Sequence, residues 1–293
     1  MLIKSYLTLV KSITNNHIMR AVLFLFIFML AGFNTLKSQI VDDILGDESM
    51  FYAETKQVNQ FFRRFNNEEG PDGVRYYKRD KEYHNPASRK KYLEMLFDSH
   101  NGALTESIRN LFINDIVNPD TSLFLNFHTN GWFAEVKTRF TYKGQETPVT
   151  FFLELEHENM GYKWVITNVY FEPYAEIFVD QKTDSTKFLH PLSHEIDFMN
   201  LIRVFNDKKD IDNYTIKSFQ ADFLTLFLYE FKQGYFKFKY VEDLKFHFFQ
   251  IPGWYFEVEQ FVRADYNSGW LISKLTKISE EEKSILLKYI YHN

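Results

Sequence analysis

The chain has 293 residues, no cysteine and a formal net charge of −5 at pH 7. The missing thiols exclude disulfides, thiolate catalysis and cysteine-bound zinc or iron–sulfur centres, and an acidic chain without a dense basic block argues against nucleic acid as a partner. Hydrophobic residues make up 45% and aromatic residues 18% of the chain, enough for the cores of two domains and typical of extensive β-sheet, because aromatic side chains suit half-buried pleated surfaces.

The N-terminal residues have the pattern of a secretory signal peptide. No acidic residue precedes Asp42, and an apolar run over 21–33 is followed by NTLKSQ. A membrane-spanning helix needs about 20 apolar residues, and this run is shorter. We therefore expect residues 1–38 to direct export, to the periplasm or the extracellular medium, with Met19 as an alternative start. A retained membrane anchor and a buried helix are the alternatives for 21–33.

Residues 50–172 are expected to form a first α+β domain. Apolar residues at helical spacing predict an amphipathic helix over 52–66 and two more helices between Pro86 and Pro119. Strands are then predicted by alternating apolar residues at 122–128, 132–140, 149–157 and 164–171. Helices followed by a meander of strands indicate the α+β class.

The pattern restarts after a polar linker at 173–192. Helices are predicted over 195–206 and 215–231, strands at 235–240, 244–250, 254–262 and 270–278, and a helix at the C-terminus. Ungapped matches join 61–67 to 201–207, 122–136 to 244–258 and 164–169 to 270–275. Their common order indicates an internal duplication, so we expect a second, shorter α+β domain over 193–293. The alternative is a chance agreement between two aromatic-rich segments.

Each half closes with a tryptophan-led strand, WVITNV (164–169) or WLISKL (270–275), preceded by a long strand that begins Gly-Trp. Helices packed on a curved antiparallel sheet with such a closing strand resemble the NTF2-like (SnoaL-like, cystatin-like superfamily) cone. The resemblance covers roughly 50–172 and 193–279 and implies two cones packed as a pseudo-dimer within the chain. Because this family includes isomerases, cyclases, dehydratases and non-catalytic binding modules, the fold alone does not decide the function.

The expected cones suggest six ligand-binding residues. His157 continues the inward-facing register of its strand and is expected at a pocket mouth, with Asn168 inward on the next strand. The alternative for His157 is a strand-end histidine exposed to water. The aromatic lining is expected to include Trp132, Trp164, Trp254 and Trp270.

Acidic residues give two further hypotheses. A cluster on one predicted strand, with Glu154, Glu156 and Glu158 beside His157, offers ligands for a divalent cation. Alternate residues of a strand point to opposite faces, however, so a single ion cannot gather all of them, and we predict no metal and no cofactor. Separately, Glu135 and Glu257 take matching places in the two halves, and we expect both on outer polar sheet surfaces; a catalytic pair is the alternative.

The sequence therefore favours an exported, non-catalytic binding or accessory protein. We expect it to engage a partner protein or a small apolar ligand through sheet faces or aromatic-lined cones, and to contact the membrane only through its N-terminal segment. The alternative is a SnoaL-like acid/base enzyme of isomerase or cyclase type with its pocket in one cone. That alternative requires an ionisable side chain deep in an apolar cavity.

Overall fold

The structure is a computed structural model. It describes residues 57–118, 120–159, 161–177, 204–206, 211–214, 216 and 222–292. The expected signal peptide at 1–38 lies outside the described residues, as do most of the linker at 173–192 and most of the helix expected over 195–206. All described residues belong to one compact unit, Phe51–Asn293.

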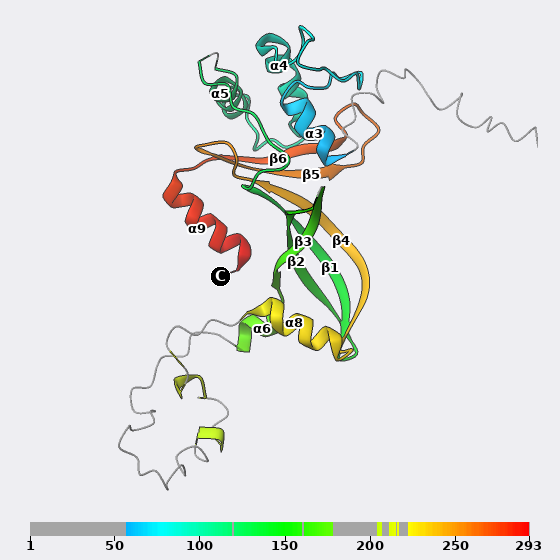
Figure 1. The fold of residues 1–293 in the computed structure, drawn as a ribbon, viewed down its shortest axis with the longest axis vertical. Helices are drawn as coiled ribbons and strands as arrows, with labels where there is room; N and C mark the ends of the chain where they lie inside the picture. The colour runs from blue at the N-terminus through cyan, green and yellow to red at the C-terminus, as the bar shows by residue number, and fades with distance from the viewer. Residues whose placement is uncertain are drawn as a thin grey trace, which may run out of the picture. The chain divides into compact units, whose positions relative to one another are not determined.

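The described helices and strands come in the order helices, strands, helices, strands, helix (Figure 1). The helices are α3 (Val58–Phe65), α4 (Pro86–Leu93), the 3-10 helix η1 (Glu94–Leu96), α5 (Glu106–Ile116), α6 (Glu172–Ile177), the 3-10 helix η2 (Ile211–Tyr214), α8 (Phe223–Lys232) and α9 (Glu280–Tyr291). The strands are β1 (Trp132–Tyr142), β2 (Gln145–Glu158), β3 (Gly161–Tyr170), β4 (Phe236–Phe248), β5 (Trp254–Phe261) and β6 (Gly269–Lys277).

These strands form one curved, antiparallel six-stranded sheet in the order β3-β2-β1-β4-β5-β6. The α+β class is therefore confirmed. The central pair of strands in the sheet is β1 with β4, so strands of the segments 50–172 and 193–293 are hydrogen-bonded to one another. The arrangement as two NTF2-like domains is consequently not confirmed. One pair of matched segments lies at different places, since Trp132 begins a central strand and Trp254 begins the strand next to an edge. The pair 164–169 and 270–275 lies on the two edge strands, β3 and β6.

Three predicted strands differ from the structure. Residues 122–128 form no strand, because side chains of the helices take their backbone hydrogen bonds. Asn66 both donates to the Leu125 carbonyl (2.8 Å) and accepts from its N–H (2.9 Å), and Arg89 donates to the Leu123 carbonyl. The strands predicted at 235–240 and 244–250 are instead the single strand β4, whose register against β1 shifts at two bulges.

The main core lies between α3, α4, α5 and one face of the sheet. The helical spacing predicted for α3 is confirmed, since Phe61, Phe62 and Phe65 are all buried against the strands. Aromatic rings interlock across this core: Phe65 stacks on Phe256 at 6.0 Å between centroids, and Phe256 stacks on Phe248 at 4.7 Å. Such side chains fill the space that an empty cone would leave.

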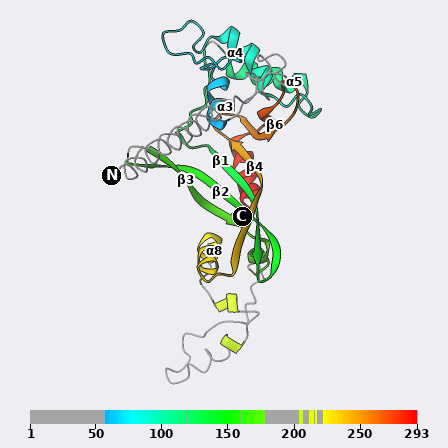
Figure 2. The same cartoon turned by 90° about the vertical axis from the view of Figure 1, so that its right-hand side faces the viewer.

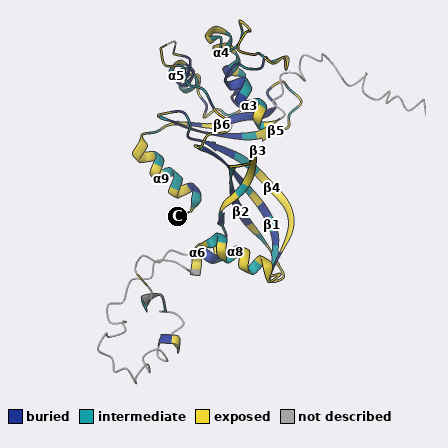
Figure 3. Cartoon of the chain, in the orientation of Figure 1, coloured by how far each residue is buried: buried dark blue, intermediate teal, exposed yellow. Residues whose placement is uncertain are grey.

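Farther along the same face, α8 covers the other end of the sheet (Figure 2), and Tyr174 of α6 packs there with it. The opposite face is covered by α9, which begins in a capping box formed by Ser279 and Glu282. Ile290 of α9 packs there with Phe133 and Tyr255. Both faces of the sheet are therefore buried near the start of β1 (Figure 3). The alternation in the sequence predicted that only one face would be buried.

Candidate functional site: a buried polar network beneath α9

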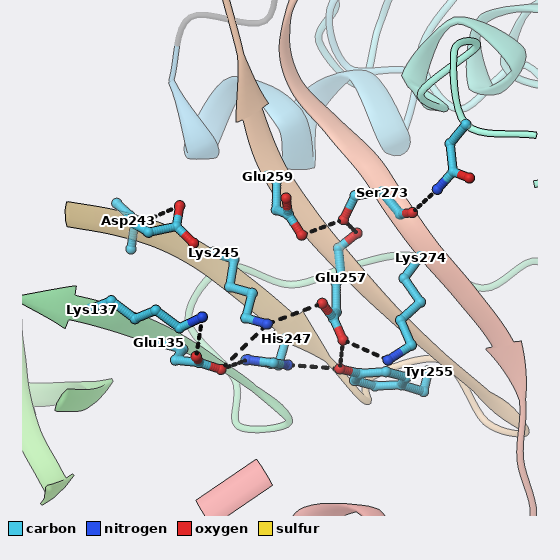
Figure 4. Close-up of polar contacts among 12 residues, drawn as sticks. Glu135, Lys137, Asp243, Lys245, His247, Tyr255, Glu257, Glu259, Ser273 and Lys274 are labelled. Carbon is cyan, nitrogen blue, oxygen red and sulfur yellow. Dashed lines mark hydrogen bonds and ion pairs between the residues drawn. The ribbon is translucent and has the colours of Figure 1, made fainter. Parts of the chain in front are cut away.

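Four polar side chains from three strands form a continuous hydrogen-bonded chain on the α9 face of the sheet (Figure 4). In β4, Nε2 of His247 lies 2.9 Å from Oε2 of Glu135 in β1. Its Nδ1 lies 2.8 Å from the hydroxyl of Tyr255 in β5, and that hydroxyl donates to Oε1 of Glu257 at 2.5 Å. All four residues are buried, and His247 is 1% exposed.

Lysines surround the two carboxylates. Nζ of Lys245 lies 3.6 Å from Oε2 of Glu135 and 3.4 Å from Oε2 of Glu257, so one ammonium bridges both acids. At the more exposed rim, Nζ of Lys274 lies 3.1 Å from Oε1 of Glu257. Lys137 approaches Oε1 of Glu135 at 3.9 Å. The buried negative charges are therefore paired, as burial requires.

Strand register explains why these residues meet. Glu135 pairs with Lys245 across β1 and β4, and His247 pairs with Glu257 across β4 and β5. Cross-strand partners share one face of a sheet at close spacing, so three neighbouring strands bring their polar residues to a single patch. The ring of Phe133 stacks on His247 at 4.8 Å and separates it from α9.

The network shifts the pKa values of its members in opposite directions. Burial alone would raise the pKa of Glu257, but the hydrogen bond from Tyr255 and the charges around it, led by Lys245, lower the pKa to about 2. For Glu135, burial is likewise outweighed by the hydrogen bond to His247 and by Lys245, so its pKa lies below the usual range. Burial, reinforced by the charge of Glu257, raises the pKa of Tyr255.

The hydrogen-bond pattern engages both nitrogens of the imidazole. Tyr255 has one proton, which it donates to Glu257. Of the ring nitrogens of His247, Nδ1 meets the Tyr255 hydroxyl and Nε2 meets Oε2 of Glu135. The network therefore joins strands and leaves neither nitrogen free to act as a base.

The structure puts the two polar candidates in separate places. His157 is exposed near the end of β2, with its ring 5.1 Å from that of Tyr162. Asn168 lies at the bulge between β2 and β3, where its side chain accepts a hydrogen bond from the N–H of Val169 (2.7 Å). The register pairs His157 with Tyr162, so at about 3.3 Å per residue the two candidates are separated by about 20 Å along β3.

Three of the four tryptophan candidates are core residues. Trp132, Trp254 and Trp270 are buried in the cluster between the sheet and the N-terminal helices. The indole N–H of Trp254 donates to Oδ2 of Asp115 at 3.1 Å, which satisfies its polar atom. Trp164 differs, because it is 41% exposed on β3, with its ring edge-on to Trp132 at 5.4 Å.

The expected exposure of Glu135 and Glu257 is wrong, since both are buried in the network. Alternation along the strands correctly put them opposite the apolar residues of the main core, but it could not reveal that α9 covers the second face. His247, central to the network, was missed. Its one sequence signal is a polar residue inside the apolar run LKFHFFQ, at 244–250.

The acidic end of β2 carries ion pairs. Nζ of Lys163 lies 2.8 Å from Glu158 and 3.5 Å from Glu156. Within the described residues, no group of three or more histidine, aspartate or glutamate side chains is arranged to hold a metal ion. None of the helices in the described part of the chain has the length and apolarity to cross a bilayer.

The NTF2-like resemblance stays an interpretation of the sequence pattern. No family model matches the chain, and neither a curated protein nor a solved structure shows significant similarity to it.

Proposed function

We propose that the protein is an exported, non-catalytic binding protein that engages a partner polypeptide through the open edge of its sheet. The observation that carries this proposal is the contrast between the two edge strands, β3 and β6. One edge is covered by the protein itself, and the other presents an exposed aromatic surface.

The β6 edge is closed by the segment after η1. Phe97 forms a bridge with Ile272, and the N–H of Asp98 donates to the Ile272 carbonyl at 3.0 Å. The side chain of Asn101 donates to the carbonyl of Ser273 at 2.7 Å. This cover occupies backbone groups that could otherwise pair with another chain.

Among the described residues, α8 packs near the end of β3, at Val169, but no backbone hydrogen bond closes the free side of the strand. Tyr162, Trp164 and Ile166 alternate along it and are all exposed on the face that carries the main core. Lys163, the charged residue that could repel an added strand, is directed instead to Glu156 and Glu158 of β2. An open edge with alternating apolar side chains is suited to strand addition, in which main-chain bonds give affinity and side chains give specificity.

A polypeptide partner fits the molecule better than a small apolar ligand. The helix-facing core is filled by interlocking aromatic rings, among them Phe61, Phe248 and Phe256. A cleft between Arg64, Tyr92 and neighbouring residues has a volume of about 10 Å³, room for about one water molecule. A ligand of drug size needs several hundred cubic ångströms.

The test is a pull-down from the native envelope fraction with three baits. The first is the parent protein, the second carries Trp164→Ser with Ile166→Ser, and the control carries Leu111→Ser with Tyr266→Ser, which are exposed apolar residues elsewhere. We expect the parent and the control to capture the same partner and the β3 variant to lose it. Equal capture by all three baits, or no specific capture, would contradict the proposal.

The acid/base enzyme has one observation in its favour, the His247 network with its shifted pKa values. Catalysis requires that the imidazole reach a substrate, however, and His247 is both buried and engaged at each ring nitrogen. Diethyl pyrocarbonate, which modifies accessible imidazoles, should react with exposed His157 and spare His247 in the folded protein. Rapid modification of His247 would favour the enzyme instead.

A further inference from the structure

The helix α8 is apolar around almost its whole circumference. Its sequence, FLTLFLYEFK, contains seven apolar or aromatic residues among ten. A helix with apolar residues on all sides is normally buried on all sides, yet Phe227 is the one buried residue of α8. Among the described residues, its neighbours leave apolar side chains of α8 facing outward.

This surface continues from α8 into the adjoining turn and strand. The exposed side chains are Leu228, Tyr229, Phe231, Tyr235 and Phe238, which together we call the α8 tip. Phe231 and Phe238 are connected through buried rings, because Phe231 stacks on Phe227, and Phe227 and Phe238 both contact the ring of Phe140. Leu228 and Tyr229 precede Phe231 in α8, and Tyr235 follows in the adjoining turn. Scattered exposed apolar residues are ordinary, but a contiguous aromatic patch indicates an interaction surface.

Lysines lie beside the α8 tip. Lys143 in the β1–β2 turn is 61% exposed, and its Nζ lies over the rings of Tyr142 (4.6 Å) and Tyr235 (5.9 Å) and 4.0 Å from Oε1 of Glu230. Lys232 is exposed at the end of α8, and Lys237 and Lys239 are exposed on β4, where Lys237 alternates with Phe236 and Phe238 and so points to the other face of the strand. Of the nearby acids, Glu230 also accepts from the hydroxyls of Tyr142 and Tyr174, and the exposed Glu146 accepts from Tyr240.

We propose that the α8 tip docks on the surface of a lipid bilayer that carries anionic headgroups. Aromatic side chains favour the interface between headgroups and acyl chains, and flanking lysines meet the negative surface charge. A second copy of the chain fits the α8 tip less well. A two-fold contact would bring Lys143 and Lys232 against the same lysines of the partner, and like charges at an interface repel. This contact would hold the protein at a membrane independently of residues 21–33.

The absence of cysteine allows a local test in the full chain. Tyr229→Cys puts one thiol on the α8 tip for a polarity-sensitive dye, and Tyr289→Cys on α9 is the matched control, since both tyrosines are more than half exposed (62% and 78%). Each protein is mixed with vesicles of phosphatidylcholine alone or of equal parts phosphatidylcholine and phosphatidylglycerol. We expect a blue shift of the dye at 229 with the anionic vesicles and none at 289. The dye reports the polarity around its own attachment site, so binding of vesicles through the N-terminal segment would not shift its emission at 229.

Two further measurements test the role of the lysines and the self-association of the chain. Each of Lys232→Gln, Lys237→Gln and Lys239→Gln in the labelled chain should lower the affinity for anionic vesicles about fivefold. An unshifted dye at 229 with anionic vesicles would overturn the proposal. So would a blue shift that grows with protein concentration in the absence of vesicles, because it would assign the α8 tip to contacts between copies of the chain.

Discussion

Nε2 of His247 lies 2.9 Å from Oε2 of Glu135, although the two residues are 112 positions apart in the chain. The pairing of β1 with β4 brings them together, and it also joins the strands of the two halves in one sheet. The polar network therefore depends on both halves, and neither half contains all of its charges. A role in joining the strands accounts for a network that is both ionic and engaged at every member.

Tyr255→Phe should destabilise the protein without changing its shape. The hydroxyl links His247 to Glu257, and its removal leaves buried hydrogen-bonding atoms without that partner. Such a loss costs about 1–3 kcal/mol. Urea unfolding measures the change, and Tyr289→Phe on the exposed face of α9 is the control that should leave the transition midpoint unchanged. An equal midpoint for both variants would mean that the hydroxyl is not held as the structure has it.

Stability should decrease as the pH falls from about 4.5 toward about 2. The pKa of Glu257 is lowered from 4.5 to about 2 in the folded protein, so over this range the unfolded chain binds protons first. Binding of protons to the unfolded state lowers the free energy of unfolding, and Glu135, with its lowered pKa, acts in the same direction. The free energy of unfolding measured against pH should show a flatter slope in Glu257→Gln than in the parent. Glu156→Gln, at an exposed site on β2, serves as the control; the same flattening in both variants would contradict the assignment.

The loss of stability on substitution of a tryptophan candidate should depend on how deeply that tryptophan is buried. Trp254→Ala should cost about 3–5 kcal/mol, because it empties a core position against Phe112 and leaves Asp115 without the indole donor. Trp164→Ala removes a ring that is partly in water, so its cost should be clearly smaller while partner binding is lost. Calorimetry or urea unfolding gives the stabilities. Comparable losses of stability would show that Trp164 is as much a core residue as Trp254.

The cap of α9 should contribute measurably to stability. Ser279 accepts from the N–H of Glu282, whose carboxylate accepts from the N–H of Ser279. Ser279→Ala should therefore cost about 1 kcal/mol and speed amide hydrogen exchange in α9. Ser284→Ala, an exposed substitution in the same helix, should cause neither change. If α9 exchanges equally fast in both variants, the capping box does not hold the helix.

Local patterns predicted individual elements better than they predicted the sheet. The spacing of Phe61, Phe62 and Phe65 was sufficient for α3, because one buried face fixes a helical period. The segment 122–128 has a strand-like pattern, but Asn66 and Arg89, distant in sequence, take its hydrogen bonds. Which strands become neighbours is likewise a long-range property, and no local pattern indicates that β1 pairs with β4.

The polar network could not be predicted from the sequence for a similar reason. Alternation put Glu135 on the face opposite Val136, and that face is solvated only if nothing covers it. The C-terminal helix α9 packs on that face. Its first residue, Glu280, lies 145 positions after Glu135 in the chain. The recurrence of glutamate at 135 and 257 was visible, but it suggested two equivalent surfaces where the structure has one shared cluster.

A double-mutant cycle between Glu135 and His247 tests most directly whether the two halves of the chain share one network. The free energies of unfolding of the parent, Glu135→Gln, His247→Gln and the double variant give the coupling energy. We predict a coupling of about 1 kcal/mol or more, because contacting residues of one buried network are not independent. A coupling indistinguishable from zero, with the two losses simply additive, would contradict the joined sheet on which this account depends.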